Sequence, residues 1–172
     1  EEFSLSTHMR VRGGDEYLDC VYDLLDNKAY MHAGMKFDEL FASEPYDSRD
    51  KDPGSDVPRY QFGIVNRFED FCSLQQAKEE EASLSRMTAG FAWKWETKKH
   101  KDAFDIVIEG IPKRWNSTQK DWVNSANAVN EVGCIHTVQG YDLNYGFVIL
   151  GPDIYYDYDK GAVCINKANF KD

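Results

Sequence analysis

The sequence predicts a single α/β domain, and three observations support this prediction. The chain has 172 residues, of which 42% are hydrophobic and 14% aromatic, which suits one buried core and is too short for two full domains. Helical periodicity is concentrated in the first half of the chain, whereas short apolar runs typical of strands occur throughout it. Helices combined with strands along the whole chain favour an α/β layer over a β-sandwich.

Two helices are predicted in the first half. Apolar residues recur at helical spacing over Asp15–Asp26 and again over Phe68–Leu84. The charged run Lys78–Glu81 in the second helix is most simply a solvated face. Residues 44–59 are rich in proline, aspartate and serine and read as a surface loop, followed by a predicted strand over Tyr60–Val65.

Strands dominate the rest of the prediction. They are expected where apolar and aromatic residues cluster, at Phe3–Met9, Met87–Trp95, Phe104–Ile108, Val132–Val138 and Phe147–Leu150. Near the C-terminus, Ile154–Tyr158 and Ala162–Ile165 flank the turn residues Asp159–Gly161. This pattern predicts a β-hairpin.

The charge and the cysteines restrict the class of protein. The formal net charge of −10 argues against a stand-alone nucleic-acid binder, although one face of a larger groove remains compatible with it. The chain has no run of eighteen apolar residues, so we expect no membrane span. Its four cysteines are widely spaced and form no CxxC pair, which predicts free thiols in a reducing cytoplasm. The start at Glu1 reads as a cut within a longer protein.

Several familiar catalytic motifs are absent from these 172 residues. There is no GxxxxGK[ST] phosphate-binding loop, and Gly13-Gly14 reads as a simple turn. HExxH and GxSxG are also missing. By itself, the chain is therefore predicted to hold no complete catalytic site.

The most informative stretch is Val132–Gly151, in which a polar segment separates two apolar runs. Open α/β sheets place ligands at the carboxyl ends of their strands, where this segment would fall. A glycine at 140 permits close approach of the backbone to a phosphate, and Asp142 is suited to accept from a sugar hydroxyl. His136 is suited to donate to a phosphate. A strand, turn and strand with a satisfied core histidine would give the same pattern.

Two segments resemble motifs of superfamily 1 helicases. Ile135–Asp142, followed by the apolar run Phe147–Leu150, looks like motif V, which has the form T/I-h-x-x-Q/K-G-x-E/D before a buried strand. Leu5–Arg10 is similar to motif IV, in which a strand ends with an arginine. The chain from about Phe3 to Asn169, including the run AGFAWKW, resembles the bacterial Schlafen group 3 type DNA/RNA helicase domain family.

This resemblance implies a fold and a set of partners. The fold would be a three-layer RecA-like domain of the P-loop NTPase type, with a mostly parallel sheet and a β-hairpin near the C-terminus. Residues 1–172 would form the second RecA-like domain, with a P-loop domain upstream and motif VI after Asp172. ATP with Mg²⁺ would be the cofactor of the longer protein, and no tightly bound cofactor is expected on this chain alone. A single strand of DNA or RNA would be the other partner.

The resemblance also implies residue roles. Arg10 matches the motif IV arginine, which reaches across the interdomain cleft to the γ-phosphate and acts in catalysis. Gly140 and Asp142 match the positions nearest the nucleotide, with the acid meeting the ribose. Gln139 lies where motif V couples the ATP and nucleic-acid sites. Because many relatives carry glutamate where this chain has Asp142, the carboxylate has a shorter reach here.

His136 and Thr137 match positions that contact the nucleic-acid backbone. The four tryptophans, Trp93, Trp95, Trp115 and Trp122, are suited either to base stacking or to the core, and we favour the core. Two functions follow for the chain. It is either the second domain of a nucleic-acid-dependent ATPase, helicase or translocase, or a non-catalytic regulatory or protein-binding module that keeps the RecA-like fold.

Overall fold

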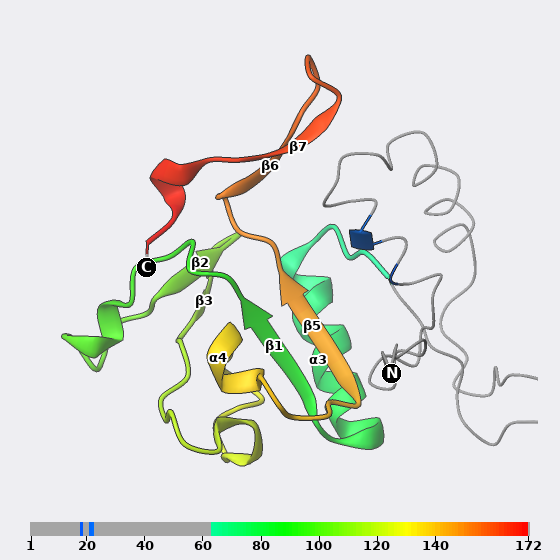
Figure 1. Ribbon diagram of the computed structural model, residues 1–172. Helices are drawn as coiled ribbons and strands as arrows, with labels where there is room; N and C mark the ends of the chain where they lie inside the picture. The colour runs from blue at the N-terminus through cyan, green and yellow to red at the C-terminus, as the bar shows by residue number, and fades with distance from the viewer. Residues whose placement is uncertain (1–17, 19–20, 23–62, 172) are drawn as a thin grey trace, which may run out of the picture. The chain divides into compact units, whose positions relative to one another are not determined.

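The computed structural model describes Leu18, Val21, Tyr22 and residues 63–171 (Figure 1). The first three of these are helical, as the prediction for Asp15–Asp26 requires. Gly63–Val65 form no strand, so the strand predicted at Tyr60–Val65 is wrong over its described part. The predicted strand at Phe3–Met9 and the loop at residues 44–59 lie outside the described residues.

A parallel three-stranded sheet forms the centre of the described structure. Strand β1 (Ser85–Ala89) lies between β4 (Val132–Cys134) and β5 (Tyr145–Ile149), and both neighbours run parallel to it. Ala89 pairs with Cys134 on one side and with Ile149 on the other, so all three strands end at the same edge. We refer to it as the carboxyl edge. The expectation of a mostly parallel sheet is confirmed for this part of the chain.

Helix α3 (Phe68–Ala82) packs against one face of this sheet. Phe71 meets Phe147 of β5 edge to face, with ring centroids 5.1 Å apart. Around this pair lies the main hydrophobic core, which also contains Phe68, Met87, Ala89, Ile106, Trp115, Val132, Cys134 and Ile149. The helix confirms the prediction for Phe68–Leu84 to within two residues at its end.

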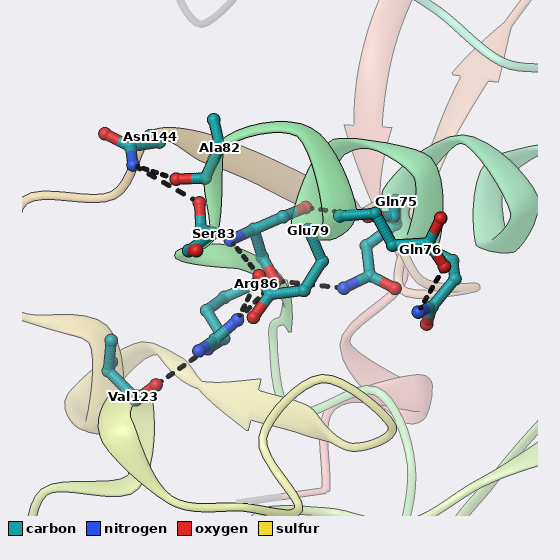
Figure 2. Close-up of polar contacts among 10 residues, drawn as sticks. Gln75, Gln76, Glu79, Ala82, Ser83, Arg86, Val123 and Asn144 are labelled. Carbon is teal, nitrogen blue, oxygen red and sulfur yellow. Dashed lines mark hydrogen bonds and ion pairs between the residues drawn. The ribbon is translucent and has the colours of Figure 1, made fainter.

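The charged run in α3 is partly buried, contrary to the prediction of a solvated face. Lys78 is only 8% exposed, and Glu79 Oε2 accepts a hydrogen bond from Arg86 Nη1 at 2.7 Å (Figure 2). Arg86 is 5% exposed and also donates to the Val123 carbonyl at 2.7 Å. The helical period places Gln75 and Lys78 on the buried stripe with Phe68 and Phe71, so charge alone misidentified the face.

Strand β1 ends earlier than the predicted strand Met87–Trp95. The strand stops at Ala89, and Gly90–Trp95 form a loop that leads into the short 3₁₀ helix η1 (Glu96–Lys98). A hairpin follows, made of antiparallel β2 (Ile106–Ile108) and β3 (Ile111–Lys113). The two turn residues between them, Glu109 and Gly110, both have positive φ, as a type I′ turn requires.

On the second face of the sheet, the 3₁₀ helix η2 (Trp122–Asn124) and the one-turn helix α4 (Ile135–Val138) pack over β4 and part of β1, whereas Val148 of β5 is exposed. A Cβ atom on Gly133 of β4 would lie 2.4 Å from the Trp122 ring, so this indole presses directly on the strand. The predicted strand Val132–Val138 is therefore correct only as far as Cys134, where α4 begins. Helices on both faces are compatible with a RecA-like fold; the three-layer arrangement stays a prediction.

The C-terminal hairpin is confirmed. Strands β6 (Ile154–Asp157) and β7 (Ala162–Ile165) pair as a two-stranded sheet, and the 3₁₀ helix η3 (Lys167–Asn169) follows. The Asp157 carboxylate accepts from the Asp159 and Lys160 amides, both at 3.1 Å, and so fixes the turn. None of the described helices has the length and apolar character needed to cross a membrane.

Candidate functional site

Three loops meet at the carboxyl edge of the sheet. They are Gly90–Trp95 after β1, the start of α4 after β4, and Leu150–Asp153 after β5. A Cβ atom on Gly151 would lie only 2.4 Å from the Ala92 Cβ, so the first and third loops pack directly against each other. The described C-terminal residues bind both loops, because Lys171 N donates to the Phe91 carbonyl at 2.7 Å and Asn169 Nδ2 to the Pro152 carbonyl at 2.8 Å.

The start of α4 is fixed by hydrogen bonds to its neighbours. The Cys134 amide donates to Asn116 Oδ1 at 3.2 Å, and the Thr137 hydroxyl donates to the Cys134 carbonyl at 2.8 Å. Thr137 is 8% exposed, so its side chain faces inward. The predicted contact of Thr137 with a nucleic-acid backbone stays a prediction, and the buried hydroxyl restricts that contact to the main chain.

His136 is exposed at the carboxyl edge. Its ring lies beside Phe91 of the loop after β1, with centroids 6.1 Å apart and planes tilted by 38°. This contact joins residues 135–142 to the AGFAWKW segment across the end of the sheet. The alternative of a buried, satisfied core histidine is therefore wrong.

The turn after α4 depends on Gly140. This residue has φ +89°, in the region that favours glycine, and no atom lies within 4 Å of the place where a Cβ would stand. Gln139, Gly140 and Asp142 are all exposed. The structure thus presents an amide, a bare stretch of backbone and a carboxylate within four residues.

From this turn the chain returns to the amino end of the sheet. The Tyr141 hydroxyl donates to Asp121 Oδ1 at 2.8 Å, and this hydrogen bond is the main cause of a raised Tyr141 pKa, with smaller contributions from burial and the Asp121 charge. Asn144 Nδ2 donates to the Ala82 carbonyl at 2.8 Å, at the end of α3 (Figure 2). Tyr145 then enters β5 opposite Ser85.

The predicted site residues are therefore spread along one crossover. His136 lies at the carboxyl edge, whereas Gly140 and Asp142 lie on the return path toward the amino edge. Arg10 lies outside the described residues, so its predicted closeness to Gly140 and Asp142 stays a prediction.

Sequence reasoning missed one organising residue of this edge, Asp105. Its side chain is buried, and its carboxylate accepts from the Thr97 amide (2.8 Å), the Thr97 hydroxyl (2.9 Å) and the Trp115 amide (2.8 Å). These bonds tie η1, and with it the loop after β1, to the residues that follow β3. The sequence did contain a sign of this role, because an aspartate inside the apolar run Phe104–Ile108 is expected to be buried, and a buried acid requires hydrogen-bond partners.

The structure tests the predictions for the tryptophans and the cysteines. Trp115 and Trp122 are 1% and 0% exposed, so the core assignment is confirmed for them. Trp93 and Trp95 are half-buried in the loop after β1 and pack against the main core, as predicted. The three described cysteines are free, as predicted, and residues 63–171 contain no group of three His, Cys, Asp or Glu able to hold a metal ion.

Comparison with known proteins gives one family and one relative. The family described as "Schlafen group 3, DNA/RNA helicase domain" matches the chain over residues 1–172. A protein of Saccharomyces cerevisiae named "Uncharacterized protein YPL245W" is 50% identical over 61 residues, which is 33% of this chain. The matched part spans 13% of that relative's length. No solved structure matches the chain.

Proposed function

The chain belongs to the Schlafen group 3 DNA/RNA helicase domain family, so its function is helicase-like and related to nucleic acid, and we propose that it is the second RecA-like half of a nucleic-acid-dependent ATPase. In this proposal, ATP with Mg²⁺ binds between this domain and a P-loop domain upstream in the same protein. Closure of the two domains then moves a helicase or translocase along a single strand of DNA or RNA.

The observation that carries this proposal is the crossover from β4 to β5. It presents His136, Gln139, Gly140 and Asp142 to solvent on a backbone that is fixed at both ends. At its start, the Thr137 hydroxyl and Asn116 hold α4; at its end, Asn144 holds the chain against α3. A fixed backbone with exposed polar groups suits ligand binding, because little order is lost when the ligand arrives.

Gly140 and Asp142 are assigned to the nucleotide. The open space around Gly140 allows a sugar or phosphate to approach the main chain closely. The exposed Asp142 carboxylate is suited to accept a hydrogen bond from a ribose hydroxyl. Gln139, one residue before Gly140, is assigned to coupling between the nucleotide and the nucleic acid.

His136 and the main chain at Thr137 are assigned to the nucleic-acid backbone. An exposed histidine donates to phosphate oxygens, and its position at the carboxyl edge places it where open α/β sheets bind ligands. Arg10 is assigned to the γ-phosphate across the interdomain cleft, where a guanidinium stabilises charge in the transition state.

The nucleotide and nucleic-acid assignments are tested separately by ATPase kinetics. The protein measured is the longer one that contains both this chain and a P-loop domain, and we call it the joined protein. We expect Asp142→Ala to raise the KM for ATP without weakening single-strand stimulation. His136→Ala should raise the strand concentration needed for half-maximal stimulation and leave the KM for ATP unchanged. Asp159→Ala, at another exposed acid in the β6–β7 turn, is the matched control and should behave as wild type.

The same experiment distinguishes the alternative function. By itself the chain should not hydrolyse ATP, since most triphosphate contacts would come from the P-loop domain. Absence of hydrolysis in the joined protein, with or without a single strand, would instead favour a non-catalytic regulatory or protein-binding module. Stimulated hydrolysis that both variants leave unchanged would show that the motif V roles are misassigned.

A further inference from the structure

Four aromatic rings form a continuous row that begins at the carboxyl edge of the sheet and runs into the main core. His136 lies 6.1 Å from Phe91, Phe91 lies 6.0 Å from Trp115, and Trp115 lies 5.8 Å from Trp95, all between ring centroids. The Lys98 ammonium stands 4.2 Å from the centroid of Trp95 and ends the row. We call these five residues the aromatic row.

The row is exposed at its ends and anchored in its middle. His136 and Lys98 are exposed, Phe91 and Trp95 are half-buried, and Trp115 is buried in the main core. The Trp115 indole N–H is buried and lacks a hydrogen-bond partner, so this residue contributes only its ring faces. Phe91 and Trp95 also pack against the main core, and each of these two rings keeps part of its surface open to solvent.

The backbone beneath the row is held by hydrogen bonds from several elements. Asp105 ties Thr97 and Trp115 together, and the Lys171 amide holds the Phe91 carbonyl. A ligand that stacks here therefore meets side chains whose positions are already fixed, which reduces the entropy lost on binding.

The stretch of chain that follows Trp93 is basic, although the chain as a whole carries a net charge of −10. Four exposed lysines lie within the eight residues that follow Trp93, and two exposed acids, Glu96 and Asp102, lie in or next to this stretch: Lys94, Lys98, Lys99 and Lys101. Lys171 is also exposed and lies on the segment that binds Phe91. Positive charge beside aromatic faces fits a ligand that combines planar rings with phosphates.

We propose that the aromatic row is a base-stacking site for an unpaired stretch of nucleic acid, with Phe91 and Trp95 stacking bases and His136 and Lys98 holding the flanking phosphates. This inference rests on the proposed function and extends it from the motif V segment to the loop after β1. Stacking accepts every base because every base has a π-face, so the site has little sequence preference. Phosphate contacts at its two ends fix the path of the strand along the row.

The test is titration of the 172-residue chain with oligo(dT) and oligo(rU) at low salt, followed by tryptophan fluorescence and anisotropy. Low salt is required because the net negative charge weakens binding at physiological salt. Phe91→Leu keeps apolar volume and removes the ring, and we expect it to weaken binding about ten-fold, the scale of losing one stacked base. Lys98→Ala should reduce the salt dependence by about one phosphate contact.

Tyr158→Ala is the matched control, since Tyr158 is an aromatic residue that is 87% exposed and outside the row. It should bind as wild type does, and circular dichroism checks that every variant is folded. Wild-type affinity in both Phe91→Leu and Lys98→Ala would overturn the proposal. So would the absence of any strand binding by the wild-type chain at low salt.

The proposed function is tested by ATP hydrolysis, independently of the binding measurements on the aromatic row. If the joined protein shows strand-stimulated ATP hydrolysis that His136→Ala weakens, the motif V assignment stands even when the row variants bind normally. If hydrolysis does not respond to strands at all, the proposed function fails regardless of binding to the row.

Discussion

At the scale of single residues, the structure depends on a few buried polar groups with several partners each. Asp105 is the clearest case, because its two carboxylate oxygens accept three hydrogen bonds while the side chain is excluded from water. Losing the charge there leaves amide donors of Thr97 and Trp115 with a weaker or absent acceptor. The cost of an unsatisfied buried group is larger than the net gain of an ordinary hydrogen bond.

We therefore expect Asp105→Asn to lower the free energy of unfolding by about 2 kcal/mol. The substitution keeps the size of the side chain, but its amide nitrogen would face a main-chain N–H donor. Urea denaturation measures the change, and Asp102→Asn at a neighbouring exposed acid is the control. Equal stability of both variants would show that the Asp105 carboxylate does not hold the loop.

Tyr141 gives a pH-dependent prediction at the same scale. Its pKa is raised chiefly by the hydrogen bond to Asp121, so the protonated phenol is favoured in the folded state. The stabilisation is complete below the ordinary tyrosine pKa of about 10 and disappears as pH rises through the higher folded value. Tyr141→Phe should remove one late-titrating signal from the NMR spectrum of ring-labelled tyrosine. Loss of an early-titrating signal instead would show that the bond to Asp121 is not formed.

At the scale of elements, the sequence patterns found the long or isolated segments and misplaced the short ones. Helix α3, strand β5 and the β6–β7 hairpin were predictable, because each has either full helical periodicity or clear turn residues at its ends. The apolar run Val132–Val138 has no such punctuation, and it divides into β4 and α4 at Cys134. The division is fixed by the packing of Trp122 against Gly133, the bond from the Cys134 amide to Asn116 and the bond from the Thr137 hydroxyl to the Cys134 carbonyl.

Two glycines near β5 give a prediction about how the loops at the carboxyl edge pack. A Cβ on Gly151 would come within 2.4 Å of the Ala92 Cβ, whereas Gly146 has no atom within 4 Å of that position. We expect Gly151→Ala to destabilise the domain by about 1–3 kcal/mol, as overpacking does. Gly146→Ala should be neutral or slightly stabilising. Thermal unfolding of both variants measures the difference, and equal melting temperatures would contradict the contact between the two loops.

At the scale of the whole molecule, the sequence singled out a candidate segment but not the residues that surround it. The chemistry of His136, Gly140 and Asp142 was readable from the sequence, as was the exposure that such chemistry needs. The contact between His136 and Phe91 was not readable, because the two residues are distant in the sequence. The inward orientation of Thr137 was not readable either, because its hydroxyl bond to the Cys134 carbonyl depends on where α4 begins. The average charge also hides local differences, since residues 94–101 carry four lysines and one glutamate within an acidic chain.

The central claim is that this domain completes an ATP site shared with a P-loop domain, and Arg10 offers the most direct test. In the joined protein, Arg10→Ala should leave ATP binding largely intact and lower strand-stimulated hydrolysis by about 10³-fold, the scale of losing an arginine finger. Arg12→Ala, two residues along the chain, is the matched control. Nucleotide affinity and single-strand-stimulated turnover would be measured for both variants. Normal turnover in Arg10→Ala, or equal losses in the two variants, would contradict the account.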